Sequence, residues 1–190
     1  MSKRKLNSGG SVTGGTGDVK PQVFTMNTGT APAIDDYVIN TTVLPVPRFG
    51  TMKTKATVFE ILWVDWYLNI VNIQDNQATE IGFLTTNTNR SDGETSTLGS
   101  FAADLLDPRT FAPAITSNTL TTSGAAAKRY PIRINMTDSN GNGMLIATDR
   151  LVVVGGGVGN ATAGDYVAKV GYRMTNIGIA EYVGIVQSQQ

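Results

Sequence analysis

The stretch Tyr166-Val-Ala-Lys-Val-Gly-Tyr-Arg-Met-Thr-Asn-Ile177 decides the fold class of this 190-residue chain. Apolar residues occupy every second position from 166 to 174, and the charges of Lys169 and Arg173 fall between them. A period of two is typical of a β-strand with one face buried. Residues 179–190 are interpreted as a further strand, so we expect the chain to end within a sheet, where its backbone groups find partners.

Short apolar segments separated by turn residues continue this pattern upstream. Residues 37–44 are rich in β-branched side chains and are followed by Pro45 and Pro47, which cannot donate to a strand ladder. In residues 56–71 apolar side chains occupy both parities, so we expect both faces of this strand to be covered. One short helix is predicted over residues 101–108. Further strands are predicted over residues 79–86, 130–136, 144–148 and 151–154.

These segments predict an all-β domain, because eight or nine short strands alternate with turns and no strand-helix-strand alternation is present. Residues 1–20 are rich in Gly, Ser and Thr, begin with basic residues and hold too little apolar surface to form a core. We therefore predict a flexible arm over residues 1–20 and a single antiparallel sandwich or barrel over residues 21–190.

Composition excludes several chemistries. The chain has no Cys and no His, which removes disulfides, thiolate nucleophiles, Ser-His-Asp triads and the usual zinc ligands. No apolar run approaches the roughly 20 residues of a membrane helix, and the first residues lack the apolar segment of a signal peptide. We expect a soluble protein made in the cytosol, without a cofactor.

Two patterns of carboxylates are candidates for an enzymatic or a metal site. Glu60 and Asp65 differ in parity and are expected on opposite faces of their strand, which disfavours a glycosidase pair, and we predict no enzyme. A second pattern matches the calcium-loop spacing D-x-N-x-N-G-x₅-D but is flanked by predicted strands, and Asn-Gly pairs are common in hairpins. We interpret it as a hairpin turn without metal and keep calcium as the alternative. Its candidate ligands are Asp138, Asn140, Asn142 and Asp149.

A glycine-rich segment, Gly155–Gly164, follows a β-rich run as a phosphate-binding loop would. It lacks the closing Gly-Lys-Ser/Thr and the G-x-G-x-x-G spacing, and the residues after it alternate as a strand where a helix is required. We predict a flexible connection of ten residues.

Charge is unevenly distributed along the chain although the net charge is zero. The first 55 residues hold seven basic and three acidic side chains, whereas residues 56–109 hold eight carboxylates and two arginines. A basic tip on a glycine-rich tether predicts contacts with nucleic-acid phosphates that have no sequence preference. Arg48, Lys53 and Lys55 are the next basic residues to consider. The predicted nucleic-acid-binding residues are Lys3, Arg4, Lys5 and, near the exit of the arm, Lys20.

Three segments, 56–66, 143–149 and the run from 169 to 190, resemble the small capsid proteins of uncultured viruses. Those proteins are similar to the capsids of circular single-stranded DNA viruses that encode a replication initiator, and Glu181-Tyr-Val-Gly-Ile-Val-Gln187 is the most specific part. The resemblance implies an eight-stranded antiparallel jelly-roll sandwich that assembles with copies of itself into a small icosahedral shell around the genome. It also implies a virion protein made in the host cytosol, with assembly there or in the nucleus.

The alternative function is a lectin-like or adhesin sandwich that binds a partner. Such a module would use exposed aromatic side chains and the loop from Asp138 to Asp149 with calcium. In the capsid interpretation, the aromatic run of Trp63, Trp66 and Tyr67 supplies core and interface area, and long loops supply contacts between subunits.

Overall fold

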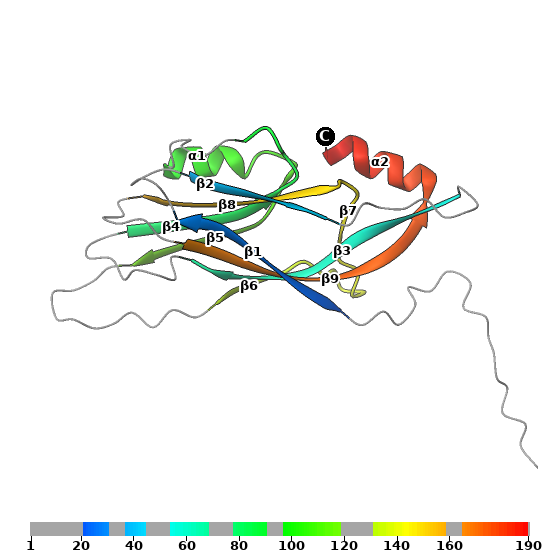
Figure 1. The fold of residues 1–190 in the computed structure, drawn as a ribbon, viewed down its shortest axis with the longest axis horizontal. Helices are drawn as coiled ribbons and strands as arrows, with labels where there is room; N and C mark the ends of the chain where they lie inside the picture. Colours follow the sequence, from blue (N-terminus) through cyan, green and yellow to red (C-terminus); the bar gives the residue numbers. More distant parts are fainter. Residues whose placement is uncertain are drawn as a thin grey trace, which may run out of the picture.

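The computed structural model describes residues 21–30, 37–44, 54–68, 78–90, 97–118, 131–158 and 165–189. Within these ranges the chain forms two stacked antiparallel sheets and two helices (Figure 1). The elements are β1 (Gln22–Thr30), β2 (Tyr37–Val43), β3 (Lys55–Tyr67), β4 (Ala78–Thr85), α1 (Leu98–Asp104), β5 (Thr110–Asn118), β6 (Ile132–Asn135), β7 (Met144–Ile146), β8 (Arg150–Val158), β9 (Asp165–Gly178) and α2 (Ile179–Gln189).

In each of the two sheets, four strands follow one another in an order that differs from their order in the sequence. The first sheet has the order β1-β9-β3-β6, with β7 also paired to β3, and the second has the order β2-β8-β4-β5. Every strand pair is antiparallel, and the chain crosses repeatedly between the sheets. Two facing antiparallel sheets with this interleaved order form a jelly roll, which confirms the predicted fold class.

The core lies between the sheets and follows the alternation that the sequence showed. Tyr166, Ala168 and Val170 of β9 are buried, and Tyr172 and Met174 pack against the same cluster. On β3, Trp66 is fully buried and its indole N–H donates to the carbonyl oxygen of Ala112 at 2.8 Å.

That carbonyl lies at a bulge in β5. Ala112 has a φ of 49°, and the register between β4 and β5 shifts where it occurs. A left-handed alanine at a bulge is strained, and here it directs the carbonyl toward the indole.

The prediction of a strand over residues 179–190 is wrong, because residues 179–189 form α2. Tyr182, Ile185 and Val186 recur at helical spacing and pack against Val58 and Ile177. β-branched residues obscured that period. Gln189, which is buried, closes the contact by donating to the Leu145 carbonyl at 2.7 Å and accepting from the Ala147 amide at 3.0 Å.

The prediction of a flexible connection over Gly155–Gly164 is also wrong for its first residues. Residues 155–157 are buried in β8 between β2 and β4. A Cβ on Gly155 would lie 2.5 Å from the ring of Tyr166, so glycine serves close packing here rather than flexibility. Residues 159–164 lie outside the described residues.

The hairpin interpretation of the Asp138 segment is wrong as well. β6 pairs with Trp63–Trp66 and β7 with Phe59–Ile61 on the same edge of β3, so the two strands follow one another along β3 and do not pair together. Together they take the place of one edge strand. The described residues thus form nine strands, which is within the eight or nine that the sequence pattern predicted and one more than the eight that the resemblance implied.

Two strands and a helix start escaped prediction. β1 has few apolar residues, and β5 contains Pro113 and the Ala112 bulge. α1 begins three residues before the predicted helix, because Thr97 and Ser100 form a capping box without the usual Glu or Gln.

Candidate functional site

The predicted arm residues Lys3, Arg4, Lys5 and Lys20 lie outside the described residues, and so do Arg48 and Lys53. Lys55 is exposed at the start of β3. The assignment of nucleic-acid binding to the arm, and the boundary between arm and domain, therefore remain predictions.

The structure brings three of the four candidate calcium ligands together. Asp138 Oδ1 accepts from the backbone N–H groups of Asn140 at 2.8 Å and Asn142 at 2.9 Å, and Oδ2 accepts from the Asn142 side-chain amide at 3.2 Å. These hydrogen bonds, led by the Asn142 amide, lower the pKa of the Asp138 carboxyl. Asp149 lies beyond β7, where its carbonyl accepts from the Leu44 amide. Thus the Asp138 carboxylate holds its own loop in shape.

No group of three or more Asp or Glu side chains within the seven described ranges could hold a metal ion. Among these residues there is also no helix long and apolar enough to cross a membrane. The calcium-dependent lectin alternative remains a prediction.

The expected separation of Glu60 and Asp65 is wrong, because β3 bulges between them. The register with β9 shifts between Ile61 and Trp63, so the extra residue Leu62 returns both carboxylates to the outer face of the first sheet. Each carboxylate pairs with an arginine, Asp65 with Arg133 and Glu60 with Arg173.

Glu60 fixes the Asp138 loop to the sheet. Its carboxylate accepts two hydrogen bonds from Arg173, at 2.6 and 2.7 Å, and one from the Gly143 amide at 2.7 Å. Arg173 also donates to the Gly141 carbonyl at 3.2 Å. Burial raises the pKa of Glu60, but the hydrogen bonds and charge of Arg173 and the Gly143 amide bring the net pKa below its usual value. A Cβ on Gly143 would lie 2.2 Å from the Ile61 carbonyl oxygen, so this contact needs glycine.

Further along β3 from the Glu60–Arg173 pair lies a surface that we call the outer patch. Asp65 of β3 is directly opposite Lys169 of β9 on one side and Arg133 of β6 on the other. Trp63 and Tyr67 flank Asp65 two residues away on the same face. The outer patch consists of Trp63, Asp65, Tyr67, Arg133 and Lys169.

Cations cover both aromatic rings of the outer patch. The Arg133 guanidinium carbon lies 4.5 Å from the Trp63 ring centroid, and Lys169 Nζ lies 4.9 Å from that of Tyr67. The underside of the Trp63 ring rests on Gly171, where a Cβ would come within 2.2 Å. The sequence showed Arg133 and Lys169 alternating with apolar residues, but only strand pairing aligns them in one row.

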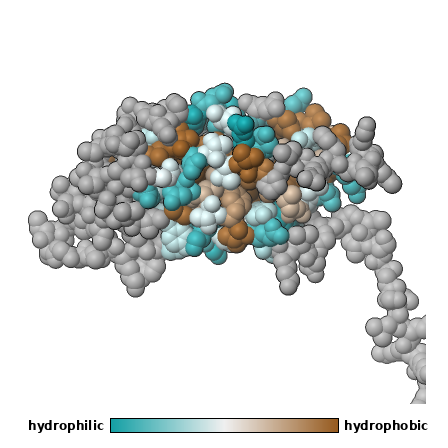
Figure 2. Space-filling view, viewed as in Figure 1, coloured by the Kyte–Doolittle hydropathy of each residue, from teal (hydrophilic) through white to brown (hydrophobic). Residues whose placement is uncertain are grey.

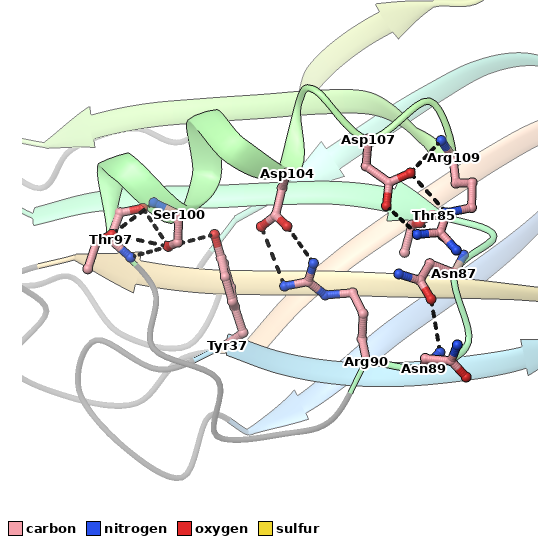
Figure 3. A network of polar contacts seen from close by, with 10 residues as sticks. All are labelled: Tyr37, Thr85, Asn87, Asn89, Arg90, Thr97, Ser100, Asp104, Asp107 and Arg109. Carbon is pink, nitrogen blue, oxygen red and sulfur yellow. Dashed lines mark hydrogen bonds and ion pairs between the residues drawn. The ribbon is translucent and has the colours of Figure 1, made fainter.

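The outer face of the second sheet is built differently (Figure 3). Arg90 lies 5.3 Å from the ring centroids of both Tyr37 and Phe83 and pairs with Asp104 at the end of α1. The Tyr37 hydroxyl lies 3.5 Å from the Ser100 hydroxyl in the first turn of α1. Burial raises the pKa of Tyr37 to about 12. These contacts fasten α1 over the sheet.

A small polar pocket of about 220 Å³ lies near the end of α2. In that pocket Arg109 is fixed by two hydrogen bonds to Asp107, each 2.9 Å. The lining residues are Thr86, Asn87, Thr88, Asn89, Arg109, Thr148, Asp149, Arg150 and Gln189.

With the strand order established, the fold is of the class found in viral capsid proteins, as solved structures show. VP1 of Trichodysplasia spinulosa-associated polyomavirus, in complex with 3'-sialyllactose, aligns with 85% of this chain and 96% of its own at a TM-score of 0.55 and 10% identity. The same protein in complex with GM1 oligosaccharide aligns with 86% of this chain and 96% of its own, at a TM-score of 0.53 and 9% identity. The chain in the Merkel cell polyomavirus virus-like particle aligns with 94% of this chain and 81% of its own, at a TM-score of 0.53 and 10% identity.

These identities are low, so the likeness concerns the fold. No protein-family model matches the sequence, and no curated protein matches it.

Proposed function

We propose that this protein is a viral capsid subunit that assembles with copies of itself into a closed shell around the genome. The observation that carries the proposal is the jelly-roll strand order, which aligns over most of the chain with capsid proteins of two polyomaviruses. The sequence resemblance to small capsids of circular single-stranded DNA viruses points to the same role independently. On this proposal the protein belongs to the virion, and its synthesis and assembly take place in the host cytosol or nucleus.

The proposed cargo is nucleic acid, in the first instance single-stranded DNA, bound without sequence preference. Lys3, Arg4, Lys5 and Lys20 would contact its phosphates from the inside of the shell. Three or four such contacts are weak in one subunit but become effective when many arms converge in one particle.

Contacts between subunits have a candidate surface beside α1. Leu106 is 84% exposed, and Leu98 and Leu105 are also exposed at the ends of the helix. These three exposed apolar side chains belong to one short helix and the two residues after it, and exposed apolar patches are typical of association sites. A second copy of this chain is the proposed occupant.

The test is expression of the full chain followed by light scattering and negative-stain electron microscopy. Closed particles of uniform size are expected, and a protein that stays monomeric at all concentrations and salts would refute the proposal. The double substitution L105S/L106S should reduce particle yield without changing the circular dichroism spectrum. Val183→Ser, an exposed apolar position on α2, is the matched control.

Removal of residues 1–20 tests the proposed arm. Truncated subunits should fold and form particles, but those particles should contain less nucleic acid, as measured by the ratio of absorbance at 260 and 280 nm. Particles with undiminished nucleic acid would assign packaging to the folded domain, and a truncated chain that does not fold would place residues 1–20 in the sheet.

A further inference from the structure

The outer patch is an uncovered part of the first sheet among the described elements. α1 lies over the second sheet, and α2 contacts β3 and β9 through Val58 and Ile177, toward the opposite end of β3 from Tyr67 (Figure 1). The charges and aromatic rings of the patch therefore need a reason other than packing against a helix.

Arg133 is held as a rigid platform. Its Nε and Nη2 atoms each donate to the Asp65 carboxylate at 2.6 Å, which leaves Nη1 outside the ion pair. The guanidinium lies over the Trp63 ring, the ring rests on Gly171, and yet the Arg133 side chain is 61% exposed. A planar cation held over an indole by an ion pair, with its side chain exposed, is suited to contact a further flat group.

The charge of the patch favours an anionic partner. Asp65 stands between Lys169 and Arg133 and forms its ion pair with Arg133, so this row of two cations and one carboxylate has one positive charge in excess. Lys169 is exposed and has three donors beyond its contact with the Tyr67 ring.

A second row of the sheet, which passes through Trp63 of the outer patch, leads toward the arm. Val23 near the start of β1 is directly opposite Gly171, which is itself opposite Trp63. Residues 1–20, with their four basic side chains, thus join the domain two strands away from the indole. A polyanion held by the arm can reach the patch without leaving the first sheet.

We propose that the outer patch binds single-stranded nucleic acid, with phosphates contacting Lys169 and Arg133 and an unpaired base stacking on the Arg133–Trp63 pair. This inference deepens the proposed capsid function, since it names a second, folded binding surface for the packaged strand. Sheet surfaces that combine cations with aromatic platforms suit single strands, because every unpaired base has a face to stack and a phosphate beside it.

The measurement uses the full chain under conditions in which light scattering shows no particles. Fluorescence anisotropy with labelled oligothymidylate and oligouridylate of about 20 nucleotides gives the Kd over a range of salt, and distinguishes DNA from RNA. Tryptophan fluorescence gives a second readout. Trp66 is fully buried and bonded to Ala112, so quenching by the oligonucleotide reports Trp63. The same sequence in a duplex should quench less, because its bases are already stacked.

The variant R133Q/K169Q removes both cations. We expect the Kd to rise about 10-fold at moderate salt, and the slope of log K against log salt to shrink by about 1.4, which is roughly 0.7 for each lost phosphate contact. The variant R109Q/R150Q removes the same charge at the polar pocket, and it should leave both quantities unchanged. Arg133→Lys keeps the positive charge but removes the planar guanidinium. It should therefore preserve the slope of log K against log salt and abolish the quenching of Trp63 fluorescence.

Three results would overturn the inference: no binding by the natural chain, equal losses in R133Q/K169Q and R109Q/R150Q, or an altered self-association of R133Q/K169Q with unchanged oligonucleotide binding. The last result would make a second copy of the chain the occupant. If R133Q/K169Q does not fold, Arg133→Lys decides through quenching alone. Patch-dependent binding by a chain that never forms particles would uphold this inference and refute the capsid proposal.

Discussion

The outer faces of the two sheets differ in chemistry and in what lies over them. On the second sheet, apolar side chains of β2, β4 and β8 form a buried cluster with Phe101 of α1. On the first sheet, the same outward positions carry ion pairs and half-buried aromatic rings. The buried residues of the second-sheet cluster are Tyr37, Ile81, Phe83, Phe101, Val152 and Val154.

This difference indicates that the outer face of the second sheet contributes to the stability of the fold, whereas that of the first sheet is available for contact with a partner. An apolar face must be covered, so α1 belongs to the folding unit of the second sheet. A face whose carboxylates are paired can remain in water at little cost, so the first sheet can present the paired Arg133 and the additional cation Lys169 to a partner. Figure 2 shows that hydrophobic and hydrophilic groups are interspersed on the face in view, with a hydrophobic group at the upper right, where α2 lies in Figure 1.

The largest expected effect is on the covered face. Phe83→Ala removes a fully buried ring that packs against Phe101 at 6.2 Å between centroids, and it should lower the free energy of unfolding by about 3–5 kcal/mol. Tyr67→Ala, the matched change on the first sheet, should cost less than about 2 kcal/mol because that ring is only partly buried. Urea unfolding measures both. Equal costs would show that the two faces share the same role.

Breaking the Glu60–Arg173 pair should have the next largest effect. Arg173→Met leaves the Glu60 carboxylate, whose side chain is only 3% exposed, without its cation and should cost about 3 kcal/mol at neutral pH. The folded-state pKa of Glu60 is lowered, so its stabilising contribution is complete above the unfolded pKa near 4.5 and is lost as pH falls through the folded value.

The difference in stability between the natural chain and Arg173→Met should therefore narrow in acid. Urea unfolding from pH 7 down to pH 3 measures it. A gap that stays constant with pH would mean that Arg173 stabilises the sheet by packing and not by charge.

A smaller loss of stability is expected from a substitution at Gly171, on which the Trp63 ring packs. Gly171→Ala would place a Cβ 2.2 Å from the indole, so the ring must move away from Arg133, at a cost of about 1–3 kcal/mol. The tryptophan emission should shift to the red as Trp63 becomes more exposed. Gly184→Ala in α2, where no atom lies within 4 Å, is the control and should instead stabilise the helix by about 0.5–1 kcal/mol. An unchanged emission spectrum for Gly171→Ala would contradict the stacked arrangement.

The smallest effect is expected at the Asp138 loop. A chelator should leave the melting temperature unchanged, because backbone amides already occupy the Asp138 carboxylate. Differential scanning fluorimetry with chelator, and then with excess calcium, measures this. A drop that calcium restores, and that Asp138→Ala abolishes, would instead establish a calcium site and favour the lectin-like alternative.

The sequence was sufficient to predict strands that have one face buried in the core and the other exposed. The alternation from Tyr166 to Met174 identified β9 and its buried face, because a half-buried strand imposes a period of two on its own residues. It could not distinguish α2 from a strand, since Ile179, Ile185 and Val186 are β-branched and only the packing of the last two against the cluster that contains Val58 selects the helix.

The outer patch could not be predicted for a related reason. Its two cations are 36 positions apart in the sequence, and the bulge at Leu62 reverses the parity by which Glu60 and Asp65 would be assigned to faces. Register and bulges depend on partners far along the chain, so a local pattern does not contain them. Gly155 illustrates the same limit, because only the position of the Tyr166 ring explains its place in a buried strand.

The division of one sheet edge between β6 and β7 has a consequence for how copies of this chain can meet. An intact edge strand exposes a continuous row of amide and carbonyl groups to which a second chain can add, and repeated addition leads to fibres. Here the edge consists of pieces of four and three residues, interrupted by a loop that Glu60 and Arg173 hold in place. Among the described residues no long ladder is offered along this edge of β3, so growth by strand addition is disfavoured there, and contact between copies at this edge depends on side chains.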